Sequence, residues 1–283
     1  MKIYRFFRIT CRPWFLVLTL IGFTGCTSTP LPRPEPEPKA IFTPSYSQEE
    51  VLAVLHAKEA AIVTLKGLFQ ADIRGEGMPF GQTINGTVMY QRPDALRLKG
   101  FSRFGNTLFD FLLKQKNFVI RVEGEEGIFT GRIAELEAAK GAHLPIQLSF
   151  QALSVILGKI QLTDADQVRF VEDPDGYQFQ LMPMQAKPGT LLNWTQHIYV
   201  DRRYTQVSQV DYLRPDGQVA VSVRASDFRR VLDASPVQTQ TLFLPYAVVA
   251  ENHQEKGNVS MKFLEMLANG PLDAKVFSFS TFQ

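Results

Sequence analysis

Cysteine is scarce in this sequence. Among 283 residues there are two cysteines, Cys11 and Cys26, and Cys11 lies in a short basic segment at the start of the chain. If that segment is removed, Cys26 is the one cysteine left, which excludes an intrachain disulfide and a metal site built from cysteines. A single remaining cysteine indicates one special use for Cys26.

The motifs of common enzyme classes are also lacking. The chain has no G-x-S-x-G turn, no P-loop, no G-x-G-x-x-G segment and no H-E-x-x-H pair. The histidines are four in number and far apart: His56, His143, His197 and His253. The acidic segments at 164–167 and 172–176 lack the spacing of a calcium loop and are typical of turns. We therefore predict no enzyme activity, no metal site and no cofactor.

Acidic residues are absent from the first 25 positions, although the whole chain has 30 Lys and Arg against 28 Asp and Glu. Four basic residues lie in this segment: Lys2, Arg5, Arg8 and Arg12. Without them the chain has 26 basic and 28 acidic side chains, a balance of −2. A nearly neutral chain has no broad positive field for holding nucleic acid, so we predict no nucleic-acid partner.

The apolar run near the start is short. Residues 13–23 (PWFLVLTLIGF) follow the basic segment. Their helix would be about 16 Å long, whereas a bilayer core is ~30 Å thick. A basic segment followed by a short apolar run and small residues is typical of a secretory signal. Residues 1–25 are therefore predicted to be a signal peptide rather than a transmembrane anchor.

The residues at the end of this run resemble a bacterial lipobox. The sequence is Phe23-Thr24-Gly25-Cys26, in which Phe23 replaces the usual aliphatic residue. The resemblance implies that Cys26 becomes the N-terminus of the mature protein and carries acyl chains on its sulfur and nitrogen. Two or three chains anchor a protein stably, because each buried CH₂ contributes ~0.8 kcal/mol. The alternative is an ordinary cleaved signal followed by an incidental cysteine.

A proline-rich stretch follows the cysteine. Six prolines occur between Pro30 and Pro44, so residues 26–45 are predicted to form an extended, solvated tether. In enterobacterial lipoproteins an Asp after the cysteine retains the protein in the inner membrane. By analogy, Thr27 favours the outer membrane, with the protein facing the periplasm.

Residues 46–283 are predicted to form one domain that is mainly β with some α. Ser47 and Glu50 have the pattern of a capping box at the start of a helix over 47–66. After Gly67 the apolar period becomes two, which indicates successive antiparallel strands. A second helix is expected near 146–158, and strands then continue to a last one over 275–282. The pattern gives about eleven or twelve strands in a large sheet or barrel.

The segment 107–114 (TLFDFLLK) is apolar on both faces. Leu108 and Leu112 face one way in a strand, and Phe109, Phe111 and Leu113 face the other. A sheet with one wet side does not need this. A curved sheet that encloses an apolar ligand explains the pattern, and so does an ordinary hydrophobic core.

Three short stretches then point to a known family. The first is Tyr90-Gln91-Arg92-Pro93 followed by Leu96-Arg97-Leu98, the second is Phe101-Ser102-Arg103-Phe104-Gly105, and the third is Leu144-Pro145-Ile146 with Leu157-Gly158. Together with the order of elements, they resemble the LolA/LolB lipoprotein-localisation superfamily. The resemblance implies an incomplete antiparallel β-barrel of about eleven strands, with an N-terminal helix and an inserted lid helix over an apolar cavity for acyl chains.

The resemblance also implies roles for individual residues. Arg92 matches an arginine that holds the lid closed through hydrogen bonds to backbone, although it could instead cap a turn. Phe101 and Phe104 match a loop that delivers lipoprotein to the membrane, although Phe104 could instead be buried. The implied cavity or lid residues are Phe109, Phe111, Leu113, Leu144, Ile146 and Leu148.

The sequence thus predicts an outer-membrane-anchored bacterial lipoprotein that binds acyl chains or lipid in lipoprotein or lipid transfer or localisation. Burial of a 16-carbon palmitoyl chain could contribute about 10 kcal/mol at ~0.8 per CH₂. Its partners would be lipid and other lipoproteins or envelope proteins. The alternative function is a structural or assembly lipoprotein that docks another envelope protein.

Overall fold

The structure is a computed structural model that describes residues 45–75, 81–124, 127–133, 144–159, 166–183, 194–235, 241–254 and 256–279. The chain divides into two units, Met1–Phe42 and Thr43–Gln283, and every described residue belongs to the second. The predicted signal peptide, Cys26 and all of the tether except Ser45 therefore lie outside the described residues.

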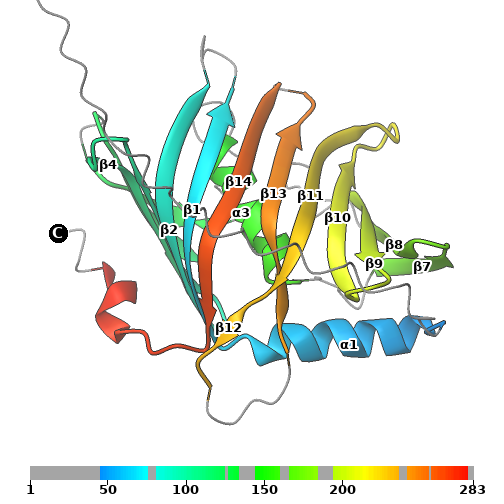
Figure 1. The fold of residues 1–283 in the computed structure, drawn as a ribbon. Coiled ribbons are helices and arrows are strands. Elements are labelled where there is room, and N and C mark those ends of the chain that lie inside the picture. Colours follow the sequence, from blue (N-terminus) through cyan, green and yellow to red (C-terminus); the bar gives the residue numbers. More distant parts are fainter. Residues whose placement is uncertain are drawn as a thin grey trace, which may run out of the picture. The chain divides into compact units, whose positions relative to one another are not determined.

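One large sheet dominates the second unit (Figure 1). The first strands are β1 (Thr64–Arg74), β2 (Gln82–Gln91), β3 (Ala95–Phe101), β4 (Thr107–Lys114), β5 (Asn117–Val122) and β6 (Phe129–Arg132). The later strands are β7 (Asp166–Glu172), β8 (Gly176–Pro183), β9 (Thr195–Asp201), β10 (Gln206–Leu213), β11 (Val219–Arg230), β12 (Leu232–Asp233), β13 (Phe243–Asn252) and β14 (Gly257–Ala268).

Two antiparallel meanders join at the middle of this sheet. The strand order is β6-β5-β4-β3-β2-β1-β14-β13-β11-β10-β9-β8-β7, and β12 pairs with β14 off this path. β6 and β7 are the two edges, so the 14-stranded sheet is not closed. The predicted incomplete antiparallel barrel is confirmed, with more strands than the eleven or twelve expected. β6, β12 and β13 were not anticipated, and Pro245 within β13 is a residue that argues against a central strand.

The N-terminal helix α1 (Gln48–Ala61) begins as predicted and ends earlier. Its capping box is present: the Glu50 N–H donates to Ser47 Oγ at 3.3 Å, and the Ser47 N–H donates to Glu50 Oε2 at 2.7 Å. The predicted range 47–66 is wrong at its end, because residues 64–66 already belong to β1. The β-branched residues at 62–64 favour strand, and Thr64 pairs with Gln91 of β2.

Two glycines in the sheet leave room for aromatic rings of neighbouring strands, which lie directly over them. A Cβ on Gly86 would lie 2.2 Å from Phe69 Cζ, and a Cβ on Gly100 would lie 2.3 Å from Phe109 Cε1. These positions in β2 and β3 therefore exclude any side chain, which is a common reason for glycine inside a strand.

The second helix, α3 (Leu144–Ile156), lies against one face of the sheet, behind it in the view of Figure 1. It packs against β10, β11, β13 and β14. The buried faces of helix and sheet form the main core, which includes Leu148, Ala152 and Ile156 of the helix. The inserted helix expected near 146–158 is thus confirmed as a cover on this inner face.

The outer face of β3–β5 is covered by the short 3-10 helix η3 (Ala274–Phe277). Phe277 is buried there in a small cluster with Ala95, Leu112 and Val119. The strand predicted over 275–282 is therefore wrong in its described part. The backbone of this segment is held by a side chain and not by pairing with a neighbouring strand: Arg97 Nη1 donates to the Val276 carbonyl at 2.7 Å. This second cluster explains why the segment 107–114 is apolar on both faces.

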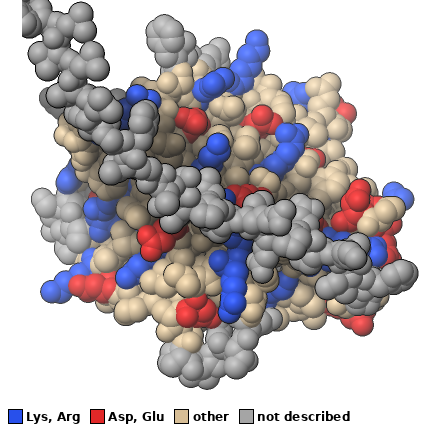
Figure 2. All heavy atoms as spheres, in the orientation of Figure 1, with Lys and Arg blue, Asp and Glu red and all other residues tan. Residues whose placement is uncertain are grey.

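The face drawn in Figure 2 carries Lys and Arg interspersed with Asp and Glu. Among the described residues in that view, no broad area has one sign of charge. This distribution agrees with the nearly neutral balance of the sequence after residue 25.

Candidate functional site

A cavity of about 440 Å³ lies between α3 and the strands β2, β3 and β4. The cavity is on the inner face of the sheet at β2–β4, whereas α3 packs directly on β10, β11, β13 and β14. Its lining residues are Tyr90, Pro93, Asp94, Leu96, Leu113, Lys116, Ile133, Phe150, Leu153, Ser154, Leu157 and Lys159. Most of these side chains are apolar, and a volume of this size is within the range of small-ligand pockets.

The sheet wall of the cavity is a row of three cross-strand neighbours. Tyr90 of β2 pairs with Leu96 of β3, and Leu96 pairs with Leu113 of β4. Residues opposite one another on adjacent strands point to the same face. The strand register therefore places these three side chains side by side under the helix.

The helix wall follows from helical spacing. Phe150, Leu153, Ser154 and Leu157 are three and four residues apart, so they share one stripe of α3 and its final turn. Gly158 has φ 66°, a left-handed conformation typical of the residue that ends a helix. The Lys159 N–H then donates back to the Ser154 carbonyl at 3.0 Å, which fixes the direction in which the chain leaves the helix.

Lys159 lies at the edge of this apolar space. Its Nζ donates to the Pro93 carbonyl at 3.3 Å and lies 4.8 Å from the centroid of the Tyr90 ring. Burial lowers the pKa of Lys159, while Glu59 and Asp94 oppose that effect. Burial also raises the pKa of Tyr90 to about 12, so its hydroxyl is neutral at pH 7.

Arg92 contacts the end of α1. Its Nη1 donates to the Ala60 carbonyl at 2.9 Å, and its N–H donates to the Val63 carbonyl at 2.9 Å. The role that the family resemblance implies for Arg92, holding the lid closed, remains a prediction. The helix that it holds is α1, and the described residues give no bond from Arg92 to α3.

The loop between β3 and β4 exposes one aromatic ring. Phe104 is 94% exposed, which excludes the alternative that it is buried. Ser102 Oγ accepts from the Phe104 N–H at 3.3 Å and from the Asn106 N–H at 3.2 Å, so the loop is held in a tight turn. Phe101 is half-buried at the end of β3. Delivery to a membrane through this loop remains a prediction.

The predicted cavity residues separate into three groups. Leu113 lines the cavity. Phe109, Phe111 and Leu148 belong to or pack on the main core, where Phe111 stacks on Phe118 with ring centroids 6.0 Å apart. The side chains of Leu144 and Ile146 lie outside the described residues. The sequence analysis did not assign Tyr90, Leu96 or the α3 stripe of Phe150, Leu153, Ser154 and Leu157 to the cavity. The helical spacing of the stripe was a signal that could have identified it.

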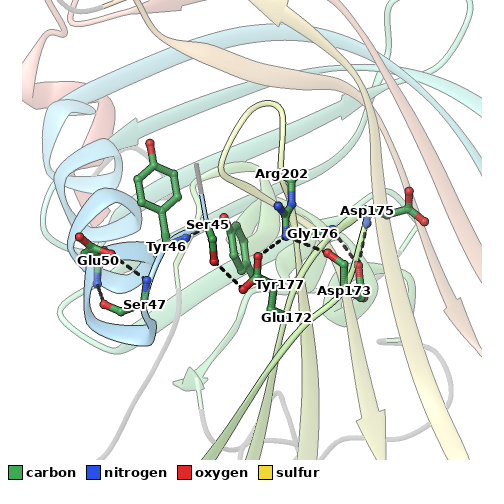
Figure 3. Close-up of polar contacts among 10 residues, drawn as sticks. All are labelled: Ser45, Tyr46, Ser47, Glu50, Glu172, Asp173, Asp175, Gly176, Tyr177 and Arg202. Atoms are coloured by element: carbon green, nitrogen blue, oxygen red, sulfur yellow. Dashed lines mark hydrogen bonds and ion pairs between the residues drawn. The ribbon is translucent and has the colours of Figure 1, made fainter. Parts of the chain in front are cut away.

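The last residue of the predicted tether is bound to the β7–β9 edge of the sheet (Figure 3). Ser45 Oγ donates to Glu172 Oε2 at 2.7 Å, and the Tyr46 N–H donates to the Tyr177 hydroxyl at 3.3 Å. Arg202 forms an ion pair with Glu172 from the other side and lies 5.1 Å from the centroid of the Tyr177 ring. The chain therefore enters the domain at a defined point.

A serine–histidine pair was also missed from the sequence. Ser222 Oγ lies 3.0 Å from His253 Nε2 on β11 and at the end of β13. Ser222 is 1% exposed, and among the described residues no carboxylate forms an ion pair with His253. Nucleophilic catalysis needs an accessible nucleophile and a base oriented by a third group, and among the described residues this buried serine and its histidine have no such carboxylate. The described residues contain no group of three or more His, Cys, Asp or Glu that could hold a metal ion.

Within the described ranges, no helix is both long enough and apolar enough to cross a bilayer. No protein-family model and no curated protein sequence matches the chain.

Solved structures match its fold. A candidate outer membrane lipoprotein-sorting protein domain from Vibrio parahaemolyticus has a TM-score of 0.57 at 7% identity, over 82% of this chain and 97% of that one. A DUF1329 family protein from Desulfovibrio piger has a TM-score of 0.60 at 12% identity, over 82% and 96%. A LolA superfamily protein from Nitrosomonas europaea has a TM-score of 0.53 at 7% identity, over 82% and 98%. The described domain therefore has the fold of lipoprotein-sorting and LolA superfamily proteins, as the resemblance implied.

Proposed function

We propose that this protein binds an acyl chain or lipid in the cavity between α3 and β2–β4 and acts in lipoprotein or lipid transfer or localisation. The observation that carries the proposal is the cavity itself, a mainly apolar space of about 440 Å³ between α3 and the sheet. The fold shared with a candidate lipoprotein-sorting domain supports it.

The size of the cavity suits one chain. At ~30 Å³ for each water-sized group, its volume of about 440 Å³ holds about fifteen such groups. That is the scale of a single long acyl chain. Burial of such a chain supplies on the order of 10 kcal/mol before the costs of binding, at ~0.8 kcal/mol per CH₂. The process needs no bond chemistry, because transfer follows from different affinities of donor and acceptor.

Ser154 offers a direct test. It lines the cavity from α3, is half-buried, and donates its hydroxyl to the Phe150 carbonyl of its own helix at 3.1 Å. A phenylalanine at this position would project a ring into the cavity, and Ser and Phe have similar helix propensities. Ser154→Phe should therefore weaken binding of a fluorescent 16-carbon fatty acid at least tenfold, whereas Ser154→Ala should stay within twofold of the native protein.

Urea unfolding of the same proteins separates blockage from misfolding. Ser154→Phe should be at least as stable as the native protein, because its ring adds buried apolar surface. The proposal fails if the native domain binds no acyl probe and carries no lipid in native mass spectrometry. It also fails if Ser154→Phe binds as tightly as Ser154→Ala.

We further propose that the domain is held at the outer membrane through acyl chains on Cys26. The lipobox-like sequence before Cys26 supports acylation of that residue. Position 27 is Thr and not the Asp that retains enterobacterial lipoproteins in the inner membrane, which supports the outer membrane. In a Gram-negative host, Cys26→Ala should move the protein from the membrane to the soluble fraction, and Thr27→Asp should move it to the inner membrane. A native mass equal to that of the unmodified chain would contradict the anchor.

A second candidate function is docking of another envelope protein. The specific observation is an apolar groove of about 250 Å³ on the outer face, lined by Leu68, Met89 and Leu267 among others. Leu264 lies on the same face and is 69% exposed. Leu68→Asp should abolish recovery of a stoichiometric protein partner if this function is correct, and it should leave acyl binding unchanged.

A further inference from the structure

Two lysines are among the residues that line the cavity. Lys159 follows the end of α3, and Lys116 lies in the turn between β4 and β5 with φ 64°. They belong to opposite walls, one on the helix side and one on the sheet side. The lining of this space is therefore mainly apolar and includes two lysines.

Lys159 has few partners for a partly buried cation. An ammonium has three donors, and the Pro93 carbonyl at 3.3 Å is its hydrogen-bond acceptor among the described residues. The face of the Tyr90 ring offers a further weak attraction at 4.8 Å. No described carboxylate forms an ion pair with it. Lys159 is half-buried and its bond to Pro93 is exposed, so a bound anion would supply an ion pair that the described residues do not.

The formal charges around the cavity sum to +1, because Lys159, Lys116 and Arg92 face two carboxylates, Asp94 and Glu59. Asp94 lines the cavity and, with Glu59, attracts Lys159 at longer range, whereas Arg92 repels it. Neither carboxylate contacts Nζ closely enough to neutralise it. Within the described ranges no carboxylate is at ion-pair distance from Lys159, so an oxyanion bound at its Nζ would be closer than any carboxylate of that part of the chain.

We propose that the cavity selects an amphiphile with one acyl chain and an oxyanion head, a carboxylate or a phosphate, whose head is bound by Lys159 and Lys116. This inference rests on the proposed function and narrows it. An acyl chain joined to a protein by an ester or amide has no charge at that end, so it would lack this contact. The preferred cargo is then an anionic lipid or free fatty acid rather than the acyl chain of a lipoprotein.

The test compares three ligands that share a 16-carbon chain: palmitate, hexadecyl phosphate and neutral hexadecanol. Residues 43–283 form a compact unit with its own core, so the protein used begins at residue 43. The variants are Lys159→Met, which keeps the apolar stem, and Lys159→Arg, which keeps the charge. Lys262→Met is the matched control, because it removes the same charge from an exposed position on β14, outside the cavity lining.

Lys159→Met should weaken palmitate or hexadecyl phosphate binding at least tenfold and change hexadecanol binding less than twofold. Lys159→Arg and Lys262→Met should retain the preference of the native protein for the anionic ligand. Palmitate and hexadecyl phosphate together show which oxyanion is preferred.

The outcomes separate this inference from the function beneath it. If the native protein binds hexadecanol as tightly as both anions, or if Lys159→Met weakens all three ligands equally, head selection is wrong while chain binding stands. If the native protein binds none of the three, both proposals are wrong. Unchanged hexadecanol binding also demonstrates that Lys159→Met is folded.

Discussion

Replacing Arg97 should destabilise the domain more than replacing any exposed arginine. Arg97 is 5% exposed in β3, and its Nε and Nη2 donate to the two oxygens of Asp110 at 2.9 and 2.6 Å. Its remaining Nη1 donates to the Val276 carbonyl of η3 at 2.7 Å. One side chain thus pairs a carboxylate that is 13% exposed and also holds the segment that covers the outer face.

The magnitude follows from what Arg97→Leu leaves behind. Removing one partner of a buried ion pair costs about 3–5 kcal/mol, because the other charge stays buried. Lys99 remains 3.2 Å from Asp110, which places the cost near the lower value. For a domain of this size, about 3 kcal/mol lowers the melting temperature by roughly 6–12 °C.

A double variant tests the reasoning rather than the number alone. In Arg97→Leu/Asp110→Leu no carboxylate is left without its partner, so urea unfolding should show that it is more stable than Arg97→Leu. The matched control is Arg229→Leu, whose ion pair with Asp227 is exposed and should contribute at most about 1 kcal/mol. A double variant no more stable than Arg97→Leu would refute the claim that the stranded charge dominates.

Three other outcomes are expected. Phe104→Ser should leave the melting temperature unchanged, because the ring is 94% exposed, and should reduce co-flotation of the domain with lipid vesicles if the loop touches membranes. Gly86→Ala should cost about 1–3 kcal/mol in urea unfolding, because its Cβ would lie 2.2 Å from the Phe69 ring. The Ser45 hydroxyl and Arg202 lower the pKa of Glu172 in the folded state. The ionised Glu172 therefore stabilises the fold above its unfolded pKa of about 4.3, and this stabilisation is lost as pH falls through the lower folded pKa. Glu172→Gln should remove this pH dependence of the unfolding free energy.

Local patterns in the sequence predicted the elements that local physics determines. The capping box at Ser47 and Glu50 fixed the start of α1, and the period of two after Gly67 predicted the first meander. The end of α1 was placed too late because residues 62–66 are apolar enough to continue a helix, whereas the pairing of Thr64 with Gln91 depends on a strand that is distant in sequence.

Features that depend on long-range contacts were not predictable from one chain. Phe277 is 163 residues from Lys114, whose Nζ donates to its carbonyl at 3.4 Å, so the place of η3 against the sheet depends on a distant strand. The local signal that was overlooked is Asp273, which caps η3 by accepting from the Lys275 N–H at 2.9 Å. The cavity depends on the cross-strand register that brings Tyr90, Leu96 and Leu113 together, and this register cannot be predicted from local sequence patterns. The apolar run at 107–114 signalled that both of its faces are covered without showing that η3 covers one of them.

The position of α3 connects the fold to the proposed cargo. Its buried residues Leu148, Ala152 and Ile156 are at most 1% exposed, so the helix is part of the main core. Lifting it from the sheet would expose Leu148 and Ile156, at roughly 1.5–3 kcal/mol for each side chain. The proposed ligand would keep its oxyanion head with Lys159 and Lys116, two of the residues that line the cavity, while its chain contacts the apolar residues of α3 and the sheet.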